Sequence, residues 1–331
     1  MGLGLRFRKC ASPSIMDNGL RAVSRLTIHM HRMPRPCRIV YSSTATIFLL
    51  FQLCLGQEAP SPSISPVQFV RQTIDNEMSA SRGPDNYFFR DEVRKPHGGQ
   101  TKLMVKTRDG MAGLIVRIDG HALTAEQKTS EQARVHRFIN NPEELKKKQK
   151  QEAENEERTN RILKAFPDAF LYEYDGTAMG TAELGQDGRP LVRLKFKPNP
   201  NYDPPSRVEQ VLTGMAGHLL IDPLQFRLAE IDGTLIQEVS FGWGIFGHLD
   251  KGGRFVVRQA DVDNGHWDLT RMELSFTGKI LLFKSLSIKS EEIESDFQRV
   301  PVDLTFAQGV QLLEQRAAQM QTNDAPQQAS K

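Results

Sequence analysis

The dipeptide Asp-Gly recurs along the chain and constrains the fold more than any other feature. Glycine tolerates the positive φ angles that a tight β-hairpin turn requires, and Asp-Gly is a preferred pair in such turns. Apolar and polar residues alternate in several neighbouring segments, at 114–118, 192–197 and 239–243. Because such alternation buries one face of a sheet, the sequence predicts antiparallel strands joined by tight turns. The five dipeptides lie at 109–110, 119–120, 175–176, 187–188 and 232–233.

Helix signals interrupt this pattern. Thr124 is followed three residues later by Gln127, and Thr305 by Gln308, which is typical of a capping box, while Asn141 precedes Pro142. We therefore expect a short amphipathic helix at 67–80, a charged helical insertion at 124–166 and a last helix from Thr305. The charged insertion is either a lid or arm, or a solvated helix that packs by one edge. In the segment 266–276 the apolar alternation slips, which predicts a β-bulge near Thr270 and Arg271.

The N-terminal region has the order of a secretory signal. A basic stretch from Arg32 to Arg38 precedes the apolar stretch 46–55, and Cys54 and Gly56 supply small residues at the −3 and −1 positions before Gln57. This pattern predicts a cleavable signal at residues 1–56, with translation starting at Met30 or Met33 in place of Met1. A retained membrane anchor and a lipoprotein site at Cys54 are the alternatives. The second would need a small residue where Leu53 stands.

Removing the signal changes both charge and cysteine content. Residues 1–56 contain Cys10, Cys37 and Cys54, so the remaining chain has no thiol and must be stabilised by a core. The full chain has 43 Lys and Arg against 40 Asp and Glu, but residues 57–331 have 35 against 39. That balance argues against a nucleic-acid binder and leaves open a peripheral association with a membrane. We expect a flexible lead-in at 57–66, one domain at 67–320 and a disordered tail at 321–331, in the periplasm or outside the cell.

Some local sequences are distinctive enough to suggest relatives. The strings at 197–205, 215–223, 239–247 and 274–284 resemble an uncharacterised family of bacterial exported proteins, over most of residues 65–315. The run Gly217–Pro223, followed by Arg227–Gly233, also resembles the periplasmic lipoprotein-carrier superfamily. This second resemblance implies an α+β fold, in which a curved antiparallel sheet forms an incomplete barrel around an apolar cavity. Its helices would pack on the concave side.

Motifs that would carry chemistry are weak. Residues 242–247 read Gly-Trp-Gly-Ile-Phe-Gly, but a turn signal at 250–253 leaves no room for the helix that a dinucleotide site needs. Residues 261–265 resemble a calcium loop but fit a β-turn better. His266 and Asp268 share a strand face without a third ligand in sequence, and His218 fits a half-buried, hydrogen-bonded histidine. We therefore predict no catalytic residue, no metal site and no cofactor.

The function that these patterns favour is non-catalytic binding of an apolar ligand in the bacterial envelope. A lipid, an acyl chain or a lipidated protein would suit an incomplete barrel with apolar walls. The residues expected to line the site are Phe241, Trp243, Phe246 and Trp267, which could equally be ordinary core. A structural or protein-interaction module of the envelope and a secreted hydrolase with acidic catalytic residues are the alternative functions. The oligomeric state stays open.

Overall fold

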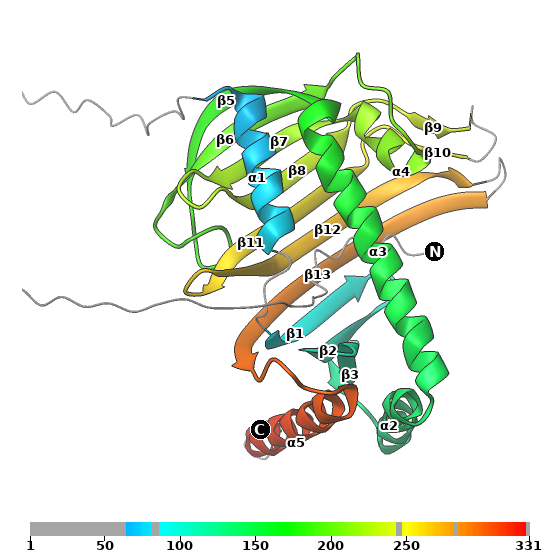
Figure 1. Cartoon of the computed structure of the whole chain (residues 1–331). Helices are drawn as coiled ribbons and strands as arrows, with labels where there is room; N and C mark the ends of the chain where they lie inside the picture. Colours follow the sequence, from blue (N-terminus) through cyan, green and yellow to red (C-terminus); the bar gives the residue numbers. More distant parts are fainter. Residues whose placement is uncertain (1–63, 81–85, 243–246, 281–283, 329–331) are drawn as a thin grey trace, which may run out of the picture. The chain divides into compact units, whose positions relative to one another are not determined.

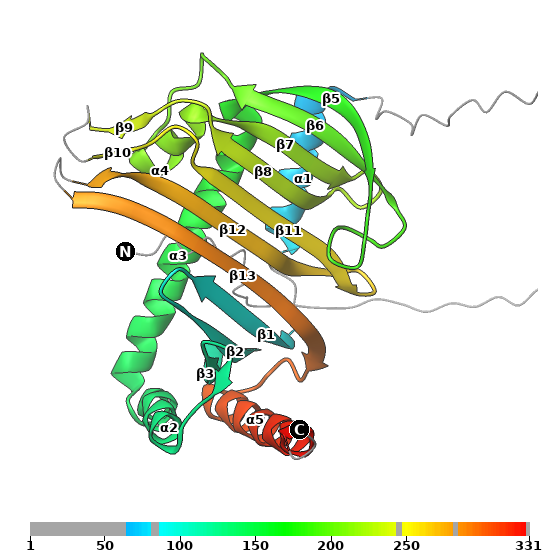
Figure 2. The same ribbon diagram turned by 180° about the vertical axis from the view of Figure 1, so that it is seen from behind.

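The alternating segments form strands of one antiparallel sheet, which is open and curved (Figures 1 and 2). The structure is a computed structural model that describes residues 64–80, 86–242, 247–280 and 284–328. Mixed helices with an antiparallel sheet confirm the predicted class. The strands are β1 (Asn86–Lys95), β2 (Gly98–Thr107), β3 (Gly110–Ile118), β4 (His121–Ala122), β5 (Phe170–Met179), β6 (Pro190–Pro198), β7 (Met215–Asp222), β8 (Arg227–Leu235), β9 (Val239–Phe241), β10 (Gly247–Leu249), β11 (Arg254–Asp263), β12 (His266–Ile280) and β13 (Lys284–Val300).

Strand order follows the chain except where β13 intervenes. Among the described residues the order is β4-β3-β2-β1-β13-β12-β11-β8-β7-β6-β5, and β10 joins β12 to β9. The long strand β13 pairs with β1 on one side and β12 on the other, so it connects the two ends of the chain within one sheet. All the described residues belong to one compact unit of the chain.

The helices α2 and α5 begin at the capping residues that the sequence predicts. At the start of α2 the Thr124 hydroxyl accepts a hydrogen bond from the Gln127 amide at 3.2 Å, and the Gln127 side chain accepts one from the Thr124 amide at 2.9 Å. Thr305 and Gln308 repeat this reciprocal pair before α5, which continues past Gln321. The helices are α1 (Pro66–Ala80), α2 (Ala125–Asn140), α3 (Pro142–Ala169), α4 (Arg207–Gln210), the 3₁₀ helix η1 (Val211–Gly214) and α5 (Phe306–Gln328).

The Asp-Gly dipeptides have several structural roles. Gly110, with a φ of 109°, turns the chain from β2 into β3, and Gly120, with a φ of 77°, turns it from β3 into β4. Gly176 has a φ of 84° inside a bulge of β5. Gly233 lies in the middle of β8, where an added Cβ would lie 2.7 Å from the Met215 sulfur. Turn formation explains the first two glycines, whereas close packing explains Gly233.

A large core fills one face of the sheet, which we call the core face. Figures 1 and 2 show α1 and α3 crossing the same side of strands β5 to β12. Apolar side chains on every second position of those strands meet the two helices, as alternation predicts. The helices contribute Phe69, Val70, Ile74, Ile162, Leu163 and Phe166, and among the strand residues are Val192, Leu194, Leu219, Ile231, Val257, Leu269 and Met272.

A smaller core lies between β1–β3, α2 and α5. It contains Phe88, Leu103, Val105, Leu114, Val135, Phe306, Val310 and Leu313. The charged helix α3 is anchored near this core as well, because Lys148 donates to the Met111 carbonyl at 2.6 Å and Gln149 to the Asp109 carbonyl at 2.9 Å. Since its other end packs in the large core through Phe166, α3 is fixed at both ends.

Candidate functional site

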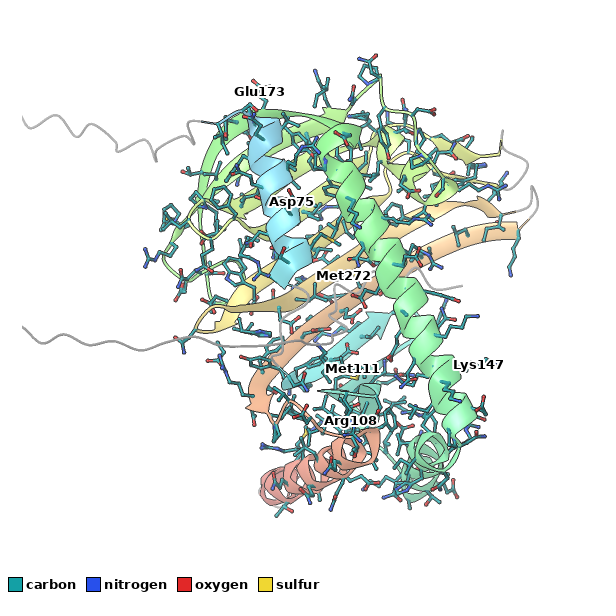
Figure 3. All side chains as sticks on the ribbon, viewed as in Figure 1. Asp75, Arg108, Met111, Lys147, Glu173 and Met272 are labelled. Atoms are coloured by element: carbon teal, nitrogen blue, oxygen red, sulfur yellow. The ribbon has the colours of Figure 1, made fainter. Side chains whose placement is uncertain are left out.

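The core face continues beyond the two helices toward one end of the sheet. Residues opposite each other in register share a face, so Leu249 and Leu286 flank Gly278 on the same side. Exposure rises along β12 in this direction: Met272 (labelled in Figure 3) is 2% exposed and Leu274 7%, whereas Phe276 is half-buried. The apolar surface therefore extends past the part of the face that the helices bury.

Four side chains form this partly exposed surface, which we call the apolar end. Phe241 comes from β9, Phe276 from β12, and Leu286 and Ile288 from β13. All four are half-buried and pack against the large core. Phe276 and Ile288 are direct cross-strand neighbours. A half-exposed apolar surface joined to a packed core can gain free energy by covering itself with an apolar molecule.

The structure separates the residues predicted to line the site. Phe241 belongs to the apolar end, while Trp243 and Phe246 lie outside the described residues. Trp267 is 3% exposed and packs in a separate cluster, which we call the outer cluster, with Leu191, Leu220 and Ala229. Its indole nitrogen donates to the Gln225 side chain at 3.0 Å. Phe241 and Trp267 therefore do not share a site.

A β-bulge interrupts β12 between Leu269 and Arg271. In the pairing of β11 with β12, Arg258 lies opposite Arg271 and Gln259 opposite Leu269, so Thr270 is the extra residue. This confirms the bulge predicted at that position. A bulge shifts the alternation of the strand that carries it. Leu269 and Met272, which are three residues apart, therefore both reach the large core, whereas Trp267 packs in the outer cluster.

Three buried carboxylates on the core face were missed by the sequence interpretation. Asp91 lies opposite Glu294 in the pairing of β1 with β13, and Glu292 lies opposite Met272 of the large core. We call Asp91, Glu292 and Glu294 the carboxylate trio; their exposures are 0%, 5% and 3%. The Lys102 ammonium is 3.7 Å from Asp91. Alternating glutamates around Ile293 were the available sequence signal, which resembles an exposed strand face.

The opposite face of the sheet carries a charged network. Glu230 on β8 accepts hydrogen bonds from His218 at 2.9 Å and from Arg258 at 2.6 Å. His218 is half-buried and hydrogen-bonded, as predicted. Burial alone would raise the pKa of Glu230, but the hydrogen bonds from His218 and Arg258 and the charge of the arginine lower that pKa below its ordinary value.

This lowered pKa predicts a loss of stability in acid. A carboxyl group whose pKa is lower in the folded state stabilises the fold above its unfolded value, about 4.3 for Glu. That contribution disappears as the pH falls through the folded-state pKa. Urea unfolding between pH 3 and pH 6 should show a steeper decline for the wild type than for Glu230→Gln. The exposed Glu157→Gln should decline like the wild type; equal slopes for Glu230→Gln and the wild type would contradict this role of Glu230.

The pair His266 and Asp268 and the segment 261–265 both make structural contacts where β11 turns into β12. His266 stacks on Tyr87 with ring centroids 3.8 Å apart, and its Nε2 is 3.6 Å from Asp268. The Tyr87 hydroxyl donates to Asp263 at 3.0 Å. The hydrogen bond from Arg299, and to a smaller extent that from Tyr87, lowers the pKa of Asp263. Asp261 accepts from the Gly265 amide at 2.7 Å, which confirms the predicted turn at 261–265.

Among the described residues, one group of three could hold a metal ion. Glu238, His248 and Asp250 place one ligand atom each within 4.8 Å of one another. His248 is 3.3 Å from Asp250 and 3.9 Å from Glu238, which are ion-pair distances when the imidazole is protonated.

Gly247 opens strand β10, so the glycine-rich motif that ends there is not followed by a helix, as predicted.

A pocket of about 450 Å³ lies beside the edge strand β5 and the start of α1. Burial is the main reason why the pKa values of Tyr172 and Tyr202 in this pocket are raised, and nearby acidic groups raise them further. Leu171 of the edge strand β5 is exposed and also lines this pocket. It is an apolar surface residue away from the apolar end and can therefore serve as a control position. The pocket walls are Pro66, Val67, Pro167, Asp168, Phe170, Leu171, Tyr172, Asn199, Asn201, Tyr202 and Asp203.

Comparisons with known proteins add no family. No protein-family model matches the chain, and no curated protein sequence matches it. Across the described helices, none combines the length and apolarity needed to cross a bilayer. The functional interpretation therefore rests on the geometry of the sheet and its two faces.

Proposed function

We propose that this protein binds an apolar ligand at the apolar end of the core face without catalysing a reaction. The ligand class is a lipid, an acyl chain or a lipidated protein. The observation that carries the proposal is the group of half-buried apolar residues that continues the large core along β9, β12 and β13. In this interpretation α1 and α3 occupy the concave side of an incomplete barrel, and the apolar end is its mouth. Export to the bacterial envelope is part of the same proposal.

The carboxylate trio is the best site for the alternative function, a secreted hydrolase. Paired carboxylates can serve as acid and base, and Asp91 and Glu294 are cross-strand neighbours. However, the three side chains are between 0% and 5% exposed, which leaves little surface for a substrate. The apolar end offers partly exposed side chains, so binding is the better supported function.

Titration with an environment-sensitive fluorescent fatty acid tests the proposal. The wild type should bind the probe saturably, and Leu286→Asp should weaken binding about tenfold or more because it places a charge against an apolar chain. Leu171→Asp is the matched control, since it adds the same charge to an exposed leucine at the opposite edge. Urea melts should show that both variants are folded. If Leu286→Asp does not fold, Leu286→Ser replaces it as the milder change. Absence of saturable binding, or an equal loss in both variants, would refute the proposal.

A further inference from the structure

The ends of four strands lie side by side at the apolar end. Phe241 of β9 pairs with Gly247 of β10, Gly247 pairs with Ile280 of β12, and Ile280 pairs with Lys284 of β13. Gly247 permits this close passage, because an added Cβ would lie 2.1 Å from the Lys279 carbonyl oxygen. Phe241, Gly247, Ile280 and Lys284 therefore mark the same end of the sheet.

Lysines are the charged residues of the strand segments that form this end. The sequence from 239 to 249 and that from 274 to 289 contain no Asp or Glu, while the second contains Lys279, Lys284 and Lys289. All three lysines are exposed. The nearest acidic residues of the β9–β10 hairpin, Glu238 and Asp250, flank its other end, next to the pair Val239 and Leu249. This local balance contrasts with residues 57–331, where acidic residues outnumber basic ones, 39 to 35.

Apolar side chains accompany the lysines. Ile280 is half-buried in the same row as Phe241, and Leu286 follows in the next row.

We infer that this end of the sheet docks on an anionic lipid bilayer, with Lys279 and Lys284 contacting headgroups and Phe241, Ile280 and Leu286 facing the apolar boundary. Apolar residues bordered by lysines have the composition of an interfacial membrane anchor. Charge complementarity selects an anionic surface over a neutral one. The inference rests on the proposed function only in sharing the apolar end, through which an acyl chain would pass between bilayer and protein.

Vesicle co-sedimentation tests this docking. The purified protein should bind phosphatidylcholine vesicles containing about a third phosphatidylglycerol, and binding should weaken as salt rises because charge screening shortens the range of attraction. The double variant Lys279→Glu, Lys284→Glu should lower the partition coefficient by about 25-fold or more, at roughly fivefold per lysine. Lys147→Glu with Lys150→Glu on α3 (Lys147 is labelled in Figure 3) is the matched control and should bind like the wild type.

The outcomes separate docking from ligand binding. Loss of vesicle binding with unchanged affinity for the fluorescent fatty acid in the Lys279, Lys284 variant supports docking at this end. Equal binding to neutral and anionic vesicles, no binding by the wild type, or an equal loss in the control would overturn the docking proposal. If vesicles bind as expected while the fatty acid does not, docking stands and the proposed ligand function fails.

Discussion

Replacing Glu77 by alanine should lower the free energy of unfolding by about 3–5 kcal/mol, because it leaves a buried arginine without its partner. Glu77 near the end of α1 accepts from Arg227 Nε at 2.7 Å and Nη2 at 3.1 Å, and from the Leu228 amide at 2.8 Å. The two side chains are 6% and 12% exposed. This pair ties α1 to the first two residues of strand β8.

Urea unfolding monitored by circular dichroism measures the effect. The matched control is Arg71→Ala on the same helix, whose partner Asp168 lies 2.7 Å away in an exposed pair. Removing an exposed pair should cost about 0–1 kcal/mol. The double variant Glu77→Ala, Arg227→Met should recover part of the loss, since it no longer buries an unpaired charge. A Glu77→Ala cost as small as that of Arg71→Ala would show that the pair does not hold α1.

Replacing Trp267 by alanine should cost about 3–5 kcal/mol of stability and leave the affinity for the fluorescent fatty acid unchanged. The indole is 3% exposed in the outer cluster, donates to Gln225 and lies under Arg227, whose guanidinium carbon is 5.4 Å from the ring centroid. Its removal therefore empties a packed site that does not belong to the apolar end.

Trp267→Phe provides the control for Trp267→Ala. It keeps much of the ring volume and should cost less than Trp267→Ala, mainly through the lost hydrogen bond to Gln225. Urea melts and probe titrations of the three proteins distinguish a core residue from a wall of the binding site. A large fall in probe affinity with little loss of stability would assign Trp267 to the ligand.

Local features of the fold could be predicted because they depend on neighbouring residues. The capping boxes at Thr124 and Thr305 and the bulge at Thr270 require only a few residues in sequence, and the structure contains all three. The turn at Gly110 follows from glycine's tolerance of positive φ. Gly233 shows the limit of that argument, because its neighbour Met215 comes from another strand.

Features that depend on strand order could not be predicted. The position of β13 beside β1 creates the pair of Asp91 with Glu294, which are far apart in sequence. The bulge at Thr270 was predicted, but the packing of Trp267 depends on Leu191, Leu220 and Ala229, which come from other parts of the chain. Only Phe241 of the predicted lining residues therefore falls in the candidate site among the residues described.

Photolabelling with a diazirine fatty acid tests ligand binding at the apolar end most directly. The purified protein is irradiated with the labelled acid and digested, and mass spectrometry identifies the modified peptides. We expect labels on the peptides that contain Phe241, Phe276, Leu286 and Ile288, competed away by unlabelled fatty acid. Labels confined to the pocket beside Leu171, or labelling that unlabelled acid does not reduce, would contradict an apolar ligand site at this end of the sheet.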